Sequence, residues 1–114
     1  MTPATAILAV VLALIFSALG TAKILALQPM RALAAEVGFS TAAYRRIGVL
    51  EVAAAVGLLT GLIQPLIGAL AGVGLLLLLG GAVVAHLRKG QGPQKFAPAV
   101  VVGLLVAAYL VIRL

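Results

Sequence analysis

The chain has 114 residues, of which 65% are hydrophobic, and its eight basic and two acidic residues give a net charge of +6. Its basic residues stand at the ends of long apolar runs, where they orient membrane helices and contact anionic lipid, so we expect no nucleic-acid partner. The absence of cysteine excludes disulfides, thiolate chemistry and iron–sulfur ligation by this chain, and a single histidine argues against a metal site.

Four apolar stretches are long enough, or nearly so, to cross about 30 Å of hydrocarbon as helices of about 20 residues. They are roughly Ala4–Leu27, Ala42–Ile63, Leu66–Leu87 and Phe96–Ile112. Because four such spans use most of the chain, the sequence predicts an all-α fold, a four-helix transmembrane bundle that forms one domain over residues 1–114. No basic residue precedes the first stretch, which is also longer than the apolar part of a signal peptide, so we expect a retained span.

The connectors between the spans carry their own helix and turn signals. Residues 29–37 place apolar side chains at helical spacing and begin with proline, which predicts a short helix lying in the membrane interface between spans 1 and 2. Ser40 or Thr41 can cap the second span. A Gln-Pro pair at position 64 predicts a tight turn, and residues 88–95 are polar, basic and rich in turn formers, as in a surface loop.

The distribution of charge predicts an orientation in the membrane. The loops after spans 1 and 3 share one side of the bilayer, whereas the opposite side, with both termini, holds only Arg113. Basic loops stay in the cytoplasm, so we expect both termini outside. The basic residues on the cytoplasmic side are Arg31, Arg45, Arg46, Arg88, Lys89 and Lys95.

Two glycine motifs, one at Gly57 and Gly61 and one at Gly68 and Gly72, put small residues on one face of adjoining spans. Small residues at this spacing let helices approach closely in a membrane. We expect these motifs to pack within the chain, with a dimer face as the alternative.

Three ionisable residues lie within or at the ends of the spans: Lys23, Glu51 and His86. Antiparallel alternation of the spans puts all three toward the cytoplasmic side. With about 1.5 Å of rise per residue, Lys23 and Glu51 lie within roughly one turn of each other in depth, so a salt bridge between spans 1 and 2 is available. His86 is expected to lie closer to water.

Each of the three residues also has a purely structural interpretation. Lys23 can extend its long side chain to the headgroups, and His86, close to other basic residues, can be an ordinary interface residue. Glu51 is too short to reach the interface and is costly in hydrocarbon, so it must be paired, protonated or beside a wet cavity. A structural ion pair and a ligand-binding or proton-handling role both stay open for it. No catalytic triad, phosphate loop or metal-ligand cluster is found in the sequence.

Three stretches together resemble the DoxX-like family of small four-helix membrane proteins. They are residues 17–23, with the sequence SALGTAK, residues 46–59, with the sequence RIGVLEVAAAVGLL, and residues 81–88, with the sequence GAVVAHLR. The resemblance covers nearly the whole chain and implies a four-helix bundle in a bacterial inner membrane. It implies roles ranging from a subunit linked to thiosulfate oxidation and quinone reduction to assembly factors for other membrane proteins, and marks Lys23, Glu51 and His86 as polar positions.

Three functional hypotheses follow from the sequence. The leading one is an accessory or assembly subunit that binds other membrane proteins, in which Lys23 and Glu51 lock the bundle. The second, in the enzyme class, is a quinone-linked redox subunit whose Lys23, Glu51 and His86 line a pocket and handle protons. The third is a carrier for a small amphiphile between the helices. The expected partners are lipids and other membrane subunits, with a homo-oligomer as an alternative, and the only cofactor considered is quinone.

Overall fold

The computed structural model describes residues 2–113, so the two ends of the expected domain, Met1 and Leu114, lie outside the described residues. The described chain folds into five helices: α1 over Pro3–Ile24, α2 over Gln28–Glu36, α3 over Thr41–Thr60, α4 over Pro65–Arg88 and α5 over Pro93–Ile112. The expected all-α fold of four long apolar helices with a short helix between the first two is confirmed.

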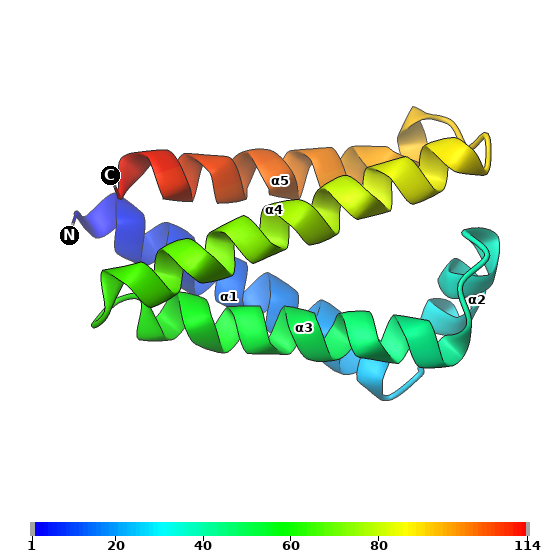
Figure 1. Ribbon diagram of the computed structural model, residues 1–114, viewed down its shortest axis with the longest axis horizontal. Helices are drawn as coiled ribbons and strands as arrows, with labels where there is room; N and C mark the ends of the chain where they lie inside the picture. The colour runs from blue at the N-terminus through cyan, green and yellow to red at the C-terminus, as the bar shows by residue number, and fades with distance from the viewer. Residues whose placement is uncertain (1, 114) are drawn as a thin grey trace.

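The four long helices form a closed ring (Figure 1). Helix α1 packs most extensively along α3, α4 contacts α3 and α5, and α5 returns to contact α1, so α1 and α4 lie on the diagonal. Both termini lie at one end of the bundle, and α2 lies at the other end with the α4–α5 loop (Figure 1). We call this second end the basic end, because most of the basic residues of the chain lie there.

The long dimension of the molecule, 40 Å, is close to the thickness of a bilayer with its headgroups, about 40–45 Å. Among the described residues, α1, α4 and α5 are long and apolar enough to cross a membrane on length and composition alone. Helix α3 has 20 residues but carries Arg45, Arg46 and Glu51. Both arginines lie in its first two turns, at the basic end, and Glu51 is paired, so α3 completes the bundle as the fourth long helix.

Three helices end at the basic end in the same type of backbone turn. At the end of α1, the Leu27 N–H donates to the Ala22 oxygen at 3.2 Å and the Ala26 N–H donates to the Lys23 oxygen at 3.1 Å, which is a Schellman motif. The residue with a left-handed backbone conformation after α1 is Ala26, with φ 52°. Gly38 and Gly90 hold the equivalent positions after α2 and α4. These turns reverse the chain sharply, so the connections at the basic end are short.

Three expected boundaries differ from the structure. The second span, expected to reach Ile63, ends as α3 at Thr60, where the turn before Pro65 begins. Helix α1 ends at Ile24 and not at Leu27, because the left-handed turn at Ala26 stops the helix. Helix α5 begins at Pro93, three residues before the expected start, since proline fits the first turn of a helix. The surface loop expected over residues 88–95 is correspondingly shorter. The Ser40 side chain caps α3 by accepting from the Ala43 N–H at 3.0 Å, as the sequence suggested.

Glycines bring the helices into close contact at three places. A Cβ on Gly48 would lie 2.6 Å from the Gly20 oxygen, so α1 and α3 touch backbone to backbone. A Cβ on Gly61 would lie 2.6 Å from the Gly68 Cα, where α3 turns into α4. A Cβ on Gly72 would lie 2.7 Å from the Leu110 side chain of α5. Both predicted glycine motifs therefore pack within the chain. The contact between Gly20 and Gly48 is a further close contact, outside the two motifs.

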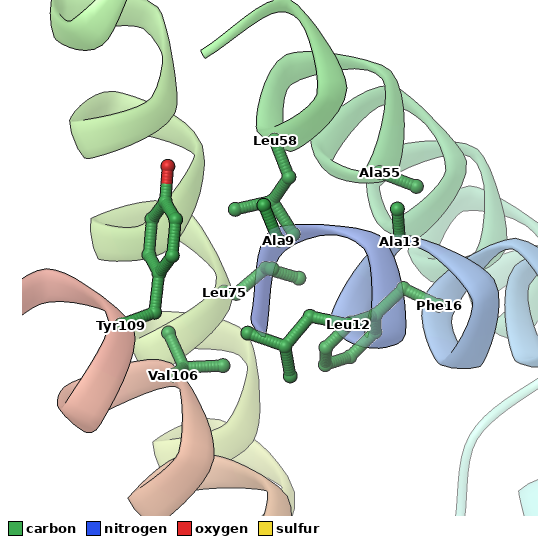
Figure 2. Packing of buried hydrophobic residues seen from close by; sticks show 9 residues of the cluster. All are labelled: Ala9, Leu12, Ala13, Phe16, Ala55, Leu58, Leu75, Val106 and Tyr109. Carbon is green, nitrogen blue, oxygen red and sulfur yellow. The ribbon is translucent and has the colours of Figure 1, made fainter. Parts of the chain in front are cut away.

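The fully packed core occupies the half of the bundle nearer the termini. Figure 2 shows side chains from all four long helices meeting there, with Leu12 and Phe16 of α1 against Leu58, Leu75 and Val106. The basic half is less filled, because α3 and α4 diverge toward α2 (Figure 1) and a cavity lies between them. The remaining members of the core are Ala9, Ala13, Ala55 and Tyr109.

The close contact between α1 and α3 makes a direct prediction. Gly48→Ala places a methyl group against the Gly20 carbonyl, so we expect it to lower the free energy of unfolding by about 1–3 kcal/mol, the usual cost of overpacking. Gly80→Ala is the control, since a Cβ on Gly80 meets nothing within 4 Å. Thermal unfolding in detergent, followed by circular dichroism, measures both. Equal melting temperatures for the two variants would show that the contact is not tight.

Candidate functional site

Lys23 and Glu51 form an ion pair across the α1–α3 contact. The Lys23 Nζ lies 2.5 Å from Glu51 Oε1, and the two side chains are 13% and 5% exposed. Each residue comes three positions after a glycine of the close contact, Lys23 after Gly20 and Glu51 after Gly48. Because residues three apart share a helix face, the glycines that bring the backbones together also aim the two charged side chains at each other.

One aromatic ring lies against the ammonium end of this pair, and a second ring packs on the first. The Lys23 Nζ lies 5.0 Å from the centroid of the Tyr44 ring, within the range of a cation–π interaction. Phe39, in the connection between α2 and α3, packs edge-on against Tyr44 at 6.4 Å. Tyr44 lies seven residues before Glu51 on α3, so the two share a face. That spacing was the signal in the sequence that could have added Tyr44 to the candidate site.

His86 lies in the last turn of α4, opposite the ion pair. Its Nδ1 donates to the side-chain oxygen of Gln91, which follows the left-handed turn of the α4–α5 loop. In the neutral imidazole this leaves Nε2 as an acceptor. No hydrogen bond joins His86 to Lys23 or Glu51 among the described residues. The structure therefore brings the three sequence-selected residues around one space and joins two of them directly.

That space is a cavity of about 240 Å³ at the basic end, which we call the basic-end pocket. The ion pair and Tyr44 form its α1–α3 wall, and α4 forms the opposite wall from Leu77 to His86. Most of the lining is apolar, so the charged pair borders an otherwise hydrophobic space. The lining residues are Phe16, Lys23, Val37, Phe39, Tyr44, Ile47, Glu51, Leu77, Leu78, Leu79, Gly81, Ala82, Ala85 and His86.

Polar contacts close to the pocket join the end of α2 to the α4–α5 loop and to the first turn of α5. Lys95 Nζ lies 3.1 Å from the Glu36 carboxylate, and the Gln91 side-chain amide donates to the Glu36 backbone oxygen at 3.3 Å. The Lys95 and Glu36 side chains are both about 40% exposed, so water screens their attraction. Because Gln91 is also the hydrogen-bond partner of His86, it links the end of α4 to the end of α2.

The chemistry available in the pocket is that of donors and acceptors for a small polar group. Lys23 has three N–H donors, of which one is used by Glu51, and His86 has a ring nitrogen to spare. Within residues 2–113, no group of three or more His, Cys, Asp or Glu side chains lies close enough to hold a metal ion. A ligand here would be held by hydrogen bonds and by the aromatic and aliphatic walls.

The four long apolar helices, with a buried ion pair beside a mostly apolar pocket, define a small integral membrane protein built as a four-helix bundle. A family model, described as the DoxX-like family, matches residues 7–109, and the chain belongs to that family. The match includes Lys23, Glu51 and His86. Neither the curated proteins nor the solved structures compared with the chain include a match.

The buried ion pair can be tested by a double-mutant cycle. Removing one partner of a buried pair leaves an uncompensated charge, which costs about 3–5 kcal/mol, so we expect Lys23→Met and Glu51→Gln each to destabilise the bundle strongly. The double variant should recover part of that loss. The matched control is the exposed pair, Lys95→Met and Glu36→Gln, where the coupling should be about 0–1 kcal/mol. Simple additivity at the buried pair in thermal unfolding would contradict the pairing.

Proposed function

We propose that this membrane protein binds the polar head of a small amphiphile in the basic-end pocket. The observation that carries the proposal is the position of the Lys23–Glu51 pair, which borders a mostly apolar cavity instead of being enclosed by packed side chains. A charged pair needed only to lock the bundle would be most stable with no cavity beside it. A few polar groups in an apolar pocket are typical of ligand sites.

A quinone is the amphiphile that fits this set of side chains best. Its flat ring suits the aromatic rings of Tyr44 and Phe39, and its carbonyl oxygens suit the free N–H donors of Lys23. Reduction of a bound quinone to the quinol would take two electrons from a donor outside the chain and two protons. The side chains of the pocket that could pass these protons are Glu51 and His86, with Lys23 and Tyr44 as the other titratable groups.

We also propose that the basic end faces the cytoplasm of a bacterial cell and that both termini face outward. Arg45, Arg46, Arg88 and Lys89 are all exposed at the basic end, whereas Arg113 is the single basic residue at the other end. Positively charged loops resist translocation and attract anionic lipid on the cytoplasmic leaflet. The pocket would then open toward the cytoplasmic half of the bilayer.

Single cysteines test the orientation, because the natural chain has none. A cysteine at Gln94, exposed at the start of α5, should resist an impermeant thiol reagent in intact spheroplasts, whereas one at Thr2 should react. Disruption of the membrane should make both cysteines reactive, which controls for local accessibility. Labelling of Gln94→Cys and protection of Thr2→Cys in intact spheroplasts would reverse the proposed orientation.

A second proposal is an accessory or assembly subunit of a larger membrane complex. The observation that favours it is the exposed face of α4 at Gly80, where a Cβ would meet nothing within 4 Å. Small residues on a lipid-facing surface let a helix of another subunit, or of a second copy, approach closely. Extraction from native membranes in mild detergent, with mass spectrometry of proteins and lipids, separates the two proposals. An amphiphile at a fixed ratio supports the first, and a stoichiometric membrane partner supports the second.

Binding measurements test the pocket directly. We expect a benzoquinone with a ten-carbon tail to bind the purified protein in lipid nanodiscs, and Lys23→Met to weaken binding about tenfold or more, since a hydrogen bond to a charged group contributes about 1.5–3 kcal/mol. Arg113→Met is the matched control, because Arg113 also lies over a tyrosine ring, that of Tyr109, but at the opposite end. Phe39→Ala, which leaves the ion pair intact, should weaken binding several-fold.

The outcome that would overturn ligand binding is equal affinity of the wild type, Lys23→Met and Phe39→Ala for the probe. Melting curves for each variant separate loss of the pocket from loss of the fold, and Phe39→Ala is the more informative variant if Lys23→Met is unstable.

A further inference from the structure

A second cavity lies outside the bundle between α3 and α4, with a volume of about 600 Å³. We call it the outer groove. Its lining is apolar throughout and includes Ala53 and Gly57 of α3 and Ala71 and Gly74 of α4. The side chains at its edges are strongly exposed, with Leu50 at 54% and Leu77 at 74%. In a membrane this groove faces the lipid.

Small residues of α3 and α4 form the floor of the groove. A Cβ on Gly57 would lie 2.9 Å from the Ala71 Cβ, so the two helices close the floor there. A Cβ on Gly74 would meet nothing within 4 Å, so the groove is open above it. From Ile67 to Leu78 the groove follows twelve residues of α4, which span roughly 16 Å at a rise of about 1.5 Å per residue.

The outer groove adjoins the basic-end pocket. Leu77 and Leu78 of α4 line both cavities, so these side chains lie between the space beside Lys23 and Glu51 and the apolar groove outside. Helices α3 and α4 diverge toward the basic end (Figure 1), and the residues of α4 that line the groove run from Ile67 to Leu78. A mostly apolar pocket with an ion pair in its wall, next to an apolar groove, matches the polarity of an amphiphile with a polar head and one tail.

We propose that the outer groove holds the apolar tail of the amphiphile whose head occupies the basic-end pocket. This inference rests on the proposed function and makes it more specific: the ligand has a single tail, and it enters sideways from the bilayer between α3 and α4. A transmembrane helix is about 10–12 Å wide with its side chains and would cover the groove without continuing past Leu77 and Leu78 into the pocket. The two leucines that border both the pocket and the groove therefore favour a tail.

The test compares probes that share one benzoquinone head but differ in the tail: no tail, a ten-carbon alkyl tail, and an isoprenoid tail of similar length. Binding is measured in nanodiscs and corrected for partition of each probe into empty nanodiscs. Gly74→Leu and Ala53→Leu fill the groove, and Gly80→Leu adds the same side chain to open space on α4 outside it. Comparison of the two tailed probes distinguishes an alkyl-chain ligand from an isoprenoid one.

We expect the tailed probes to bind the wild type and Gly80→Leu at least tenfold more tightly than the tailless probe. In Gly74→Leu and Ala53→Leu this advantage should be lost while the affinity for the tailless probe is unchanged. A photoreactive group at the tail end should label residues 50–57 and 67–78. Persistence of the tail advantage in both groove variants, or labelling confined to α5, would overturn the groove as the tail site, whereas failure of all three probes to bind the wild type would overturn the proposed function itself.

Discussion

The close approach of α1 and α3 at Gly20 and Gly48 is the constraint on which the rest of the structure depends. It brings two backbones into contact, and the residues three positions later, Lys23 and Glu51, then meet at 2.5 Å. A carboxylate within an apolar helix is costly unless it is paired. The ion pair therefore depends on the glycine contact. Larger side chains at the crossing of α1 and α3 would push the two charges apart and leave both unpaired in a poorly solvated place.

The two halves of the bundle are packed differently. Near the termini, side chains from α1, α3, α4 and α5 fill the interior, with Leu12, Leu58 and Val106 fully buried. At the basic end α4 leans away from α3, and the space is left to a pocket walled by the ion pair, Tyr44 and His86. A membrane bundle tolerates this arrangement because its outer surface is solvated by lipid and its association depends on local helix contacts.

The short turns at the basic end position the pocket. Left-handed residues at Ala26, Gly38 and Gly90 end three helices, so Lys23 and His86 are held in the last turns of α1 and α4, and Phe39 folds back over Tyr44. The contacts of Glu36 with Gln91 and Lys95 then join the end of α2 to the α4–α5 loop and to the first turn of α5. Few residues are needed to build this site, because each turn places its side chain with little freedom.

The sequence by itself determined the four long helices, the short α2 and the depth at which Lys23 and Glu51 meet, because hydrophobic length and helical rise are local properties. It also pointed to Gly57, Gly61, Gly68 and Gly72 as contact residues. Only the tertiary structure decided that α3 and α4 diverge, that Phe39 and Tyr44 join the site, and that Leu77 and Leu78 separate a pocket from a groove. Helix tilt and rotation depend on packing between residues far apart in the chain, which no local pattern records.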